Sequence, residues 1–540
     1  MNNIYNFKNA IRHFIGINEI NFPFEINEIN IDNLSWTEPI KFRIRKENDK
    51  YRILKLPNIL NFICAYEKFK NYKNFEDTSN IDKHKRLVPN IQTGDFKTGS
   101  YDFRLEEDFK LLSIYDNLIK LDIKSFYGRI YTHNIQFENL GDENYLTNLN
   151  LGNTNGLIMS NYISLYFAEK YLKEISDNIN ERLNKEFIDC SFSYFSDDFY
   201  FFCNKKDNQK IIDIFDIVLE KYDLERNNAK IELLGYMEYN NYNLVEKYWK
   251  KIISESRAYC NDEKTNNKLY FVNQLIYRMT NLKDDKQRKI FLTTFFKSTY
   301  FNELDIKKYM IEEYNFHQIC YMYRFCPEII LYSINKFKYF SCFKGNDFKK
   351  FLEIRYKELL NTYFNEEQLY YYYAIKVLGF DSILKETIYD VIESNNQILI
   401  SYYLKDRIFN DDNIEKLKLN KSEEYWFQNY HLILFSDLIN QDRETIIKEY
   451  LMPKWIRDNP NNKKSIQIKQ ETYLKFYNRN LDLGIIIIND IHNIKQNIEE
   501  YISLKIEERV LVFGDDKNNC YWGLFNNFIY KYNFFKEIWT

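Results

Sequence analysis

Two neighbouring aspartates lie inside a strongly aromatic segment of the chain. Asp197 and Asp198 follow Tyr194-Phe-Ser and precede Phe199-Tyr-Phe-Phe. Carboxylate oxygens are ligands that Mg²⁺ prefers, and buried aromatic flanks fix such a pair rigidly, as a metal site requires. Aspartate is also a common turn residue, so a solvated turn between two strands is the alternative for this segment taken alone.

A third aspartate, Asp122, ends a short apolar segment that begins at Leu118. This segment is typical of a buried strand, where an unpaired charge is costly. The alternative is an aspartate that ends the strand and caps the next turn. If neighbouring strands bring Asp122 to the aspartate pair, the three carboxylates could hold metal ions for phosphoryl chemistry.

A third segment lies between the other two. Gly156 precedes Ser160, Asn161 and Ser164, and Glu169 follows them. We expect a helix over 158–175 that the glycine opens and whose early polar residues share a face. An ordinary helix N-terminus is the alternative, but the joint occurrence of the three segments in this order favours a functional site.

The elements that must position these residues fall into two groups. Before residue 255 the pattern mixes strands and helices. We expect a hairpin over 41–55, two strands within 193–202 and a helix over 208–223. Beyond a polar linker at 257–267 the pattern becomes helical. The predicted features there are a helix opened by Pro327, a helix over 347–363, a helix over 366–378 that ends at Gly379, and an exposed loop over 452–471.

Composition excludes several classes of protein. The chain has 75 Lys+Arg against 78 Asp+Glu, so it is no generally basic nucleic-acid coat. Its eight cysteines form no CxxC pair, which argues against a zinc site or a disulfide scaffold. The N-terminal residues do not resemble a signal peptide, and the longest apolar runs are too short to span a bilayer. We therefore expect a cytoplasmic protein with no membrane partner.

In this order the motifs resemble those of a reverse-transcriptase palm. Asp122 to Tyr127 is similar to motif A, Gly156 to Glu169 to motif B, Phe195 to Asp198 to motif C, and Leu224 to Lys230 to motif D. Upstream, Ile44 to Asn58 is similar to the fingers hairpin. The resemblance covers roughly residues 40–235.

One branch is favoured within that family. The segment YGRIYTHNI, residues 127–135, resembles the corresponding stretch of bacterial abortive-infection reverse transcriptases of the AbiK type. The resemblance implies an α+β fingers-palm domain over 1–255, a linker over 256–267, and an all-α HEAT-like helical repeat domain over 268–540. It also implies antiphage defence, homo-oligomers, and DNA synthesis without a template on a primer supplied by the protein itself.

The resemblance also implies roles for individual residues. Asp122 and Asp197 would bind two Mg²⁺ ions, and Asp198 would support them. Lys46 and Arg52 would face each other across the hairpin and hold the triphosphate of a dNTP, or else belong to a solvated charged hairpin. Further roles are a proton donor to pyrophosphate at Lys230, a sugar gate at Tyr127, and a nucleotide pocket at Gly156 and Asn161. For Lys230 the alternative is a surface lysine, and for Tyr127 a core aromatic.

Three departures from the family pattern keep a second function open. Ile158 and Arg45 replace prolines, and Phe195 replaces the tyrosine of motif C. Because the usual proline and tyrosine shape the template and primer grip, these changes argue against templated copying. The resemblance implies instead template-independent, protein-primed synthesis of single-stranded DNA attached to the protein. An RNA-templated reverse transcriptase that uses a bound RNA is the alternative, and a non-catalytic scaffold is a third. With 47 tyrosines, the priming residue stays unknown.

Two further pieces are assigned no role in the chemistry. The second acidic pair, Asp515 and Asp516, is interpreted as a turn. His133 lies in the family stretch, and we expect it to pack or to form a hydrogen bond.

Overall fold

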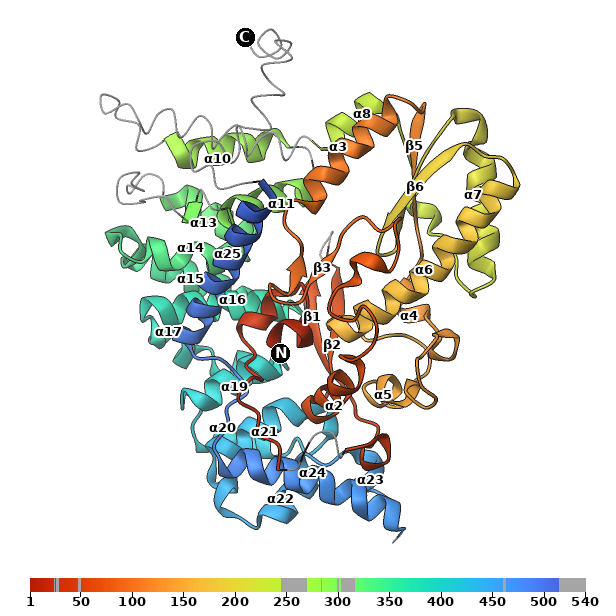
Figure 1. The fold of residues 1–540 in the computed structure, drawn as a ribbon. Helices are drawn as coiled ribbons and strands as arrows, with labels where there is room; N and C mark the ends of the chain where they lie inside the picture. Colours follow the sequence, from red (N-terminus) through yellow and green to blue (C-terminus); the bar gives the residue numbers. More distant parts are fainter. Residues whose placement is uncertain are drawn as a thin grey trace.

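A computed structural model describes residues 1–513 except 24, 26–28, 47–49, 244–269, 283, 299–300, 303–315 and 460–462. The predicted linker at 257–267, the domain boundaries near it and the second acidic pair lie outside the described residues. Before the gap at 244–269 the chain mixes strands and helices, and beyond it the named elements are helical. In Figure 1 the mixed part lies on the right, and the helical part lies on the left and along the bottom.

The predicted hairpin is confirmed. Strands β1 (Ile40–Arg45) and β2 (Tyr51–Leu56) pair antiparallel, with Ile40 opposite Leu56 and Arg45 opposite Tyr51. The hairpin lies between the two parts of the molecule (Figure 1). It therefore has helices of the second part on one side and the mixed part on the other.

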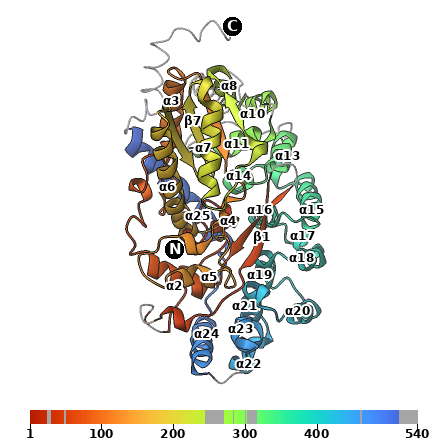
Figure 2. The same cartoon turned by 90° about the vertical axis from the view of Figure 1, so that its right-hand side faces the viewer.

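A four-stranded sheet forms the centre of the mixed part. Its order is β6-β7-β5-β8, all antiparallel, which confirms the predicted strands around both aspartate segments. Helices α6 and α7 pack against each other on one face (Figure 2), whereas α3 and α8 contribute to a small cluster of buried residues with Leu118 and Phe202 of the sheet. The bounds are β5 (Asn117–Asp122), β6 (Cys190–Phe195), β7 (Asp198–Cys203), β8 (Glu232–Leu234), α3 (Ser100–Leu112), α6 (Tyr162–Lys185), α7 (Asn208–Glu220) and α8 (Tyr236–Tyr242).

The predicted helix over 158–175 is shifted in the structure. Helix α6 begins at Tyr162 and runs to Lys185, and the side chain of Asn161 caps it by accepting a hydrogen bond from the Ser164 backbone N–H at 2.9 Å. Gly156 therefore lies in the preceding loop and does not open the helix. The aliphatic residues that precede Tyr162 suggested helix, but the asparagine is the better start signal.

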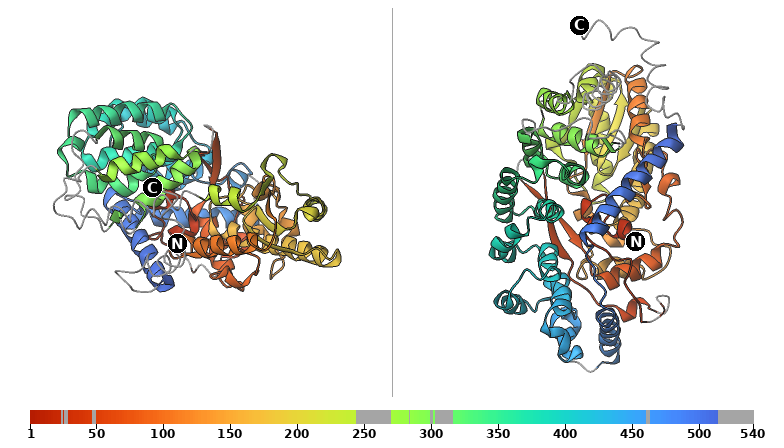
Figure 3. Two further views of the ribbon diagram at one scale, coloured as in Figure 1. Left: turned by 90° about the horizontal axis from the view of Figure 1, so that it is seen from above. Right: turned by 90° about the vertical axis from the view of Figure 1, so that its left-hand side faces the viewer.

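The helices after residue 270 stack in two rows. In one row α14 contacts α16, α16 contacts α19, and α19 contacts α21. In the other α13 contacts α15, and α15 contacts α18. Figure 3 shows this stack from two further directions. The bounds are α10 (Tyr270–Asn281), α11 (Asp285–Phe296), α13 (Phe316–Phe325), α14 (Ile329–Phe337), α15 (Asn346–Leu360), α16 (Asn365–Leu378), α18 (Ile388–Glu393), α19 (Gln397–Lys405) and α21 (Trp426–Phe435).

Predictions within the helical part have mixed outcomes. Gly379 ends α16 with φ +73°, as expected for a glycine that closes a helix. The predicted loop over 452–471 is wrong, because α23 (Lys454–Arg457) and α24 (Lys464–Asp482) occupy much of it. The first turns of α24 are polar and mostly exposed, so their sequence is typical of a loop. Its later turns bury Tyr473 and Tyr477, which anchor the helix.

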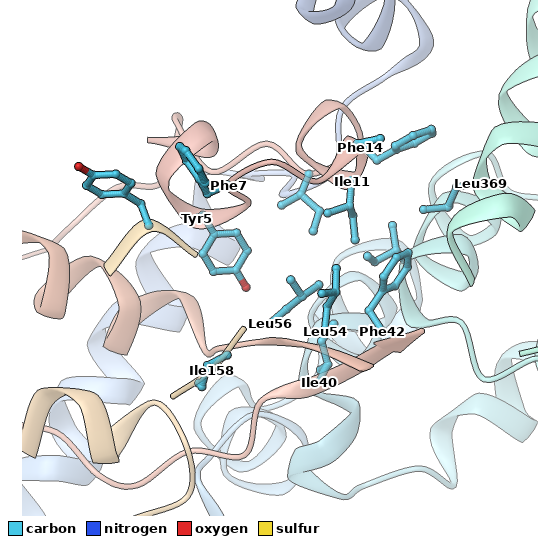
Figure 4. Packing of buried hydrophobic residues seen from close by; sticks show 14 of the residues in the cluster. Tyr5, Phe7, Ile11, Phe14, Ile40, Phe42, Leu54, Leu56, Ile158 and Leu369 are labelled. Atoms are coloured by element: carbon cyan, nitrogen blue, oxygen red, sulfur yellow. The ribbon is translucent and has the colours of Figure 1, made fainter. Parts of the chain in front are cut away.

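One hydrophobic core joins both parts of the chain. Figure 4 shows Phe42 and Leu54 of the hairpin, Phe14 of the N-terminal segment and Leu369 of α16 in one cluster. Helix α25 (Ile491–Phe513) then returns across the molecule and contacts α14 and α16 as well as the N-terminal segment. None of the helices in the described ranges combines the length and apolar character needed to cross a bilayer.

Candidate metal and nucleotide site

Three carboxylates meet at one end of the central sheet. Asp122 is the last residue of β5 and lies directly opposite Asp198, the first residue of β7. Asp197 lies in the turn between β6 and β7. One oxygen from each of the three side chains lies within 4.8 Å of the others. The juxtaposition predicted from the sequence is therefore present.

Backbone bonds fix the position of the turn that carries Asp197. Only Ser196 and Asp197 separate the paired strands, and Ser196 has φ +53°, a left-handed conformation used in tight hairpin turns. The N–H of Ile123 donates to the carbonyl of Asp197 at 2.9 Å, which ties the turn to the end of β5. Tyr194 and Phe199 on either side of the turn are fully buried, as the aromatic flanks predicted.

Two side chains from one loop hold Asp122. The amide of Asn227 donates to Oδ1 at 2.8 Å, and the Lys230 ammonium contacts Oδ2 at 2.5 Å. The Asn227 N–H also donates to the Asp122 carbonyl at 2.7 Å. The loop of the motif D resemblance therefore fixes the orientation of one carboxylate, a role that the sequence did not predict for Asn227.

The site carries excess negative charge. Burial raises the pKa of Asp197, and the charge of Asp122 raises it further. Burial also raises the pKa of Asp198 to about 6, with added effects from Asp197 and Asp122. Burial by itself would lower the pKa of Lys230, but the bond to Asp122 and the other carboxylates raise it. Within the part of the chain that the structure describes, Lys230 is the only cation in an ion pair with any of the three carboxylates.

This donor set fits a divalent cation. Three carboxylates face one ammonium, and like charges directly opposite each other across two strands are destabilising. A cation of the Mg²⁺ class, which prefers hard oxygen ligands, would offset that repulsion. The charges of Lys230 and Lys120 lower the pKa of Asp198 only in part, because burial and the neighbouring carboxylates still raise it overall.

Tyr127 lies beside the carboxylates. Its ring is partly buried and packs edge-on against Phe126 at 5.6 Å between centroids. Burial raises its pKa, and the charges of Glu169 and Asp197 raise it further, whereas interaction with Ser196 and the charge of Arg52 lower it. The tyrosine therefore lies near both the acidic turn and the hairpin.

Gly156 and Asn161 support this region from behind. Gly156 has φ +93°, and a Cβ there would lie 3.2 Å from the Gly128 carbonyl oxygen, so glycine is required by conformation and by space. The Leu157 N–H donates to the Tyr127 carbonyl at 2.8 Å. Asn161 is buried and its side-chain oxygen caps α6. Both residues position the loop behind Tyr127, and a direct contact of Asn161 with a nucleotide stays a prediction.

The two cations predicted in the hairpin do not face each other. Arg52 lies opposite Ile44 in the strand register, and Lys46 lies just beyond the end of β1. Pairing of Lys46 with Arg52 requires a turn that is longer than the observed one, because Lys46 closes the turn through its N–H bond to the Lys50 carbonyl. Both side chains are exposed. Arg52 lies within electrostatic range of Tyr127, whereas Lys46 lies at the tip.

Some residues near the site were not predicted. The Lys8 ammonium lies over the rings of Phe96 and Phe195, at 4.9 and 5.1 Å from their centroids, next to the acidic turn. Lys85, also not predicted, forms a buried ion pair at 3.0 Å with Glu169 of the motif B segment. No local signal in the sequence links Lys8 to a turn nearly 190 positions away. His133 forms a hydrogen bond with Glu143 at 2.8 Å, as expected.

Comparison with known proteins adds little. No protein-family model matches the sequence, and no curated protein matches it. Among solved structures, the telomerase from Candida albicans in complex with a fragment of telomeric RNA has 12% sequence identity and a TM-score of 0.26. The match covers 76% of this chain and 66% of the telomerase chain, which is just under two thirds of its length.

Proposed function

We propose that this chain is a metal-dependent nucleotidyltransferase that polymerises deoxynucleotides at the Asp122, Asp197 and Asp198 site. The observation that carries the proposal is the meeting of these three carboxylates at the end of paired strands, with oxygens within 4.8 Å. Two divalent ions held there would supply Lewis-acid activation of a hydroxyl and charge neutralisation on the phosphates. The ordered resemblance to palm motifs supports the same chemistry.

The chain's own residues then bind and orient the substrate. Asp122 and Asp197 hold the ions, and Asp198 adds negative charge beside them. Arg52, exposed on β2 and within electrostatic range of Tyr127, binds triphosphate oxygens, with Lys46 at the hairpin tip as a second cation. The Tyr127 ring excludes a ribose 2′-hydroxyl.

Lys230 has two roles in this proposal. In the arrangement described above it neutralises Asp122. With divalent ions bound at the carboxylates, Lys230 would no longer be needed to neutralise Asp122, and its ammonium would donate a proton to the leaving pyrophosphate. A lysine ammonium is protonated at neutral pH, as a proton donor requires.

The finer assignment rests on the resemblance of residues 127–135. We infer template-independent, protein-primed DNA synthesis in antiphage defence by a homo-oligomer with a HEAT-like helical part. The alternative is RNA-templated reverse transcription with a bound RNA. The departures at Ile158, Phe195 and Arg45 favour the untemplated form.

The test is incubation of purified full-length protein with each labelled dNTP and Mg²⁺, without added nucleic acid. We expect labelled product to grow, and to be lost with chelator or with Asp197→Asn. The matched control is Asp213→Asn, which changes an exposed aspartate on α7. Equal activity of Asp197→Asn and Asp213→Asn would contradict the assigned site.

A second measurement separates the two primer mechanisms. If the protein primes synthesis, the product stays with the protein through boiling in detergent and is released by protease. Product that migrates freely after denaturation would favour the templated alternative.

A further inference from the structure

A cavity lies where the hairpin meets the helical part, on the side of β1 that faces α16. Its volume is about 220 Å³. Its charged and aromatic lining residues are three cations, two carboxylates and two aromatics: Arg45, Lys289, Arg324, Asp285, Glu367, Tyr321 and Phe325. They come from β1, α11, α13 and α16, so the cavity exists only because these distant segments pack together.

The cations of this cavity differ in how they are compensated. Arg45 is held by Glu367 through two bonds of 2.6 and 2.9 Å and stacks on the ring of Phe364 at 3.6 Å. Lys289 and Arg324, in contrast, have no carboxylate within ion-pair distance among the residues that the structure describes. Asp285, the second carboxylate of the lining, pairs with Arg288 at 2.7 Å. Lys289 and Arg324 therefore leave an excess of positive charge in the cavity, which favours an anionic ligand such as a phosphate group.

Exposed aromatic rings accompany these cations. Tyr321 is 49% exposed and stacks on Phe325, with centroids 6.2 Å apart and planes at 17°. Further along the hairpin, the Arg43 guanidinium lies over the rings of Tyr51 and Tyr363, at 5.8 and 5.5 Å. These two tyrosines are 45% and 65% exposed.

Arg43 and Arg45 connect the two aromatic sites. They are two positions apart on β1, so their side chains lie on the same face of the strand. Each stacks on an aromatic ring of the segment just before α16, Tyr363 for one and Phe364 for the other. The cations and the exposed rings thus form one continuous strip, which we call the Arg/Tyr seam: Arg43, Arg45, Tyr51, Tyr363, Lys289, Arg324 and Tyr321.

We propose that the Arg/Tyr seam binds single-stranded nucleic acid, with a backbone phosphate at Lys289 and Arg324 and bases stacked on the exposed tyrosines. Cations that follow a backbone and aromatic rings that stack on bases are the features by which proteins hold single strands. The cavity is smaller than the roughly 300–1,000 Å³ of pockets that enclose whole small molecules, which disfavours a free nucleotide. The proposal rests on the proposed function only for the origin of the strand.

The test uses the full-length protein and a labelled single strand of about 20 nucleotides, long enough to cover the seam. Its affinity is measured by fluorescence anisotropy at several salt concentrations. We expect Lys289→Gln with Arg324→Gln to weaken binding about tenfold and to lower the salt dependence by roughly one ion per lost phosphate contact. Tyr321→Ala should weaken binding with no change in salt dependence, because it removes stacking and not charge.

The matched control is Lys463→Gln with Lys464→Gln, two exposed lysines at the start of α24 that bear the same change of charge. Equal weakening by both pairs would overturn the proposal, because it would reflect net charge alone. Unchanged binding by seam variants whose circular dichroism matches that of the wild type would also overturn the proposal. So would competition by a free dNTP that is as effective as competition by the unlabelled strand.

Two arms distinguish the source of the strand and the failure of the proposed function. DNA and RNA strands of one sequence are compared, and preference for DNA identifies a product strand, whereas preference for RNA identifies a bound RNA. Either preference supports the proposal if substitutions in the Arg/Tyr seam abolish binding of the preferred strand. Asp197→Asn should bind the strand like the wild type. If polymerisation is never observed but the seam variants still lose binding, the seam stands and the proposed function fails.

Discussion

At the scale of single residues, the protein compensates one of its three clustered carboxylates and leaves the others to repel. Asp122 has the Lys230 ammonium and the Asn227 amide as partners. Asp197 and Asp198 lie close to each other and to Asp122. Burial and the charges of these neighbours raise the pKa of Asp198 to about 6.

We predict that Asp198→Asn stabilises the metal-free protein, whereas Asp122→Asn does not. Removal of a repelling charge should raise the free energy of unfolding by on the order of 1–3 kcal/mol. Asp122→Asn instead leaves Lys230 without its carboxylate, which cancels the gain. Chemical denaturation at neutral pH with chelator measures both. Equal effects of the two substitutions would contradict the described charge distribution.

Tyr127 gives the second prediction at this scale. Its ring lies beside the turn of Asp197, and the loop behind it is fixed by the Leu157 bond. We expect Tyr127→Ala to increase incorporation of ribonucleotides relative to deoxynucleotides, because the ring no longer blocks the 2′-hydroxyl. Tyr127→Phe keeps the ring and should leave the ratio unchanged. If neither substitution alters the ratio, Tyr127 is a core aromatic.

At the scale of elements, helix α21 contains a buried histidine that should make stability depend on pH. His431 is fully buried, and its Nδ1 lies 2.9 Å from the Phe427 carbonyl of the same helix. Burial lowers its pKa to about 3, from about 6.5 in an unfolded chain. Above about pH 6.5 both states are neutral and the group has no effect. Below it, only the unfolded chain takes up the proton.

We therefore predict that acid weakens the wild type more than His431→Phe. Between about pH 6.5 and 4 the difference should grow by up to about 1.4 kcal/mol per pH unit. Urea unfolding at several pH values measures it. His133→Gln is the control, since His133 is half exposed. Parallel pH profiles of the wild type and His431→Phe would show that His431 does not titrate on unfolding.

Local patterns predicted elements better than their ends. The hairpin and the two aspartate strands follow from short apolar segments separated by turns, and the register of β5 and β7 then brings the carboxylates together. The predicted start of α6 at residue 158 is wrong, because the aliphatic residues before Asn161 resemble a first helical turn although they precede the cap. Pairing of Lys46 with Arg52 failed because register depends on the length of the turn. Lys8 and the Arg/Tyr seam could not be predicted, because they depend on segments far apart in sequence.

At the scale of the whole molecule, the two parts of the chain depend on each other. The Phe14 carbonyl accepts a hydrogen bond from the Tyr402 hydroxyl at 2.9 Å, and Ile15 pairs with Ile488. From the other end, the Tyr501 hydroxyl donates to Asp95 at 2.9 Å. The N-terminal segment thus lies within the helical part, and the last described helix is bound to the first part.

The last prediction is that residues 1–267 alone do not form an active protein. Without the helical part, Phe14 and Phe42, which are at most 2% exposed, lose their cover. Exposure costs about 1.5–3 kcal/mol for each large apolar side chain. A handful of such losses matches the roughly 5–15 kcal/mol that stabilises a whole domain. We expect an insoluble or inactive fragment, measured by sedimentation and dNTP incorporation.

The control is the full chain cleaved by protease near residue 267 after folding, which should stay associated and active because the shared core is already formed. A soluble fragment with full activity would show that the first part folds and works without the second.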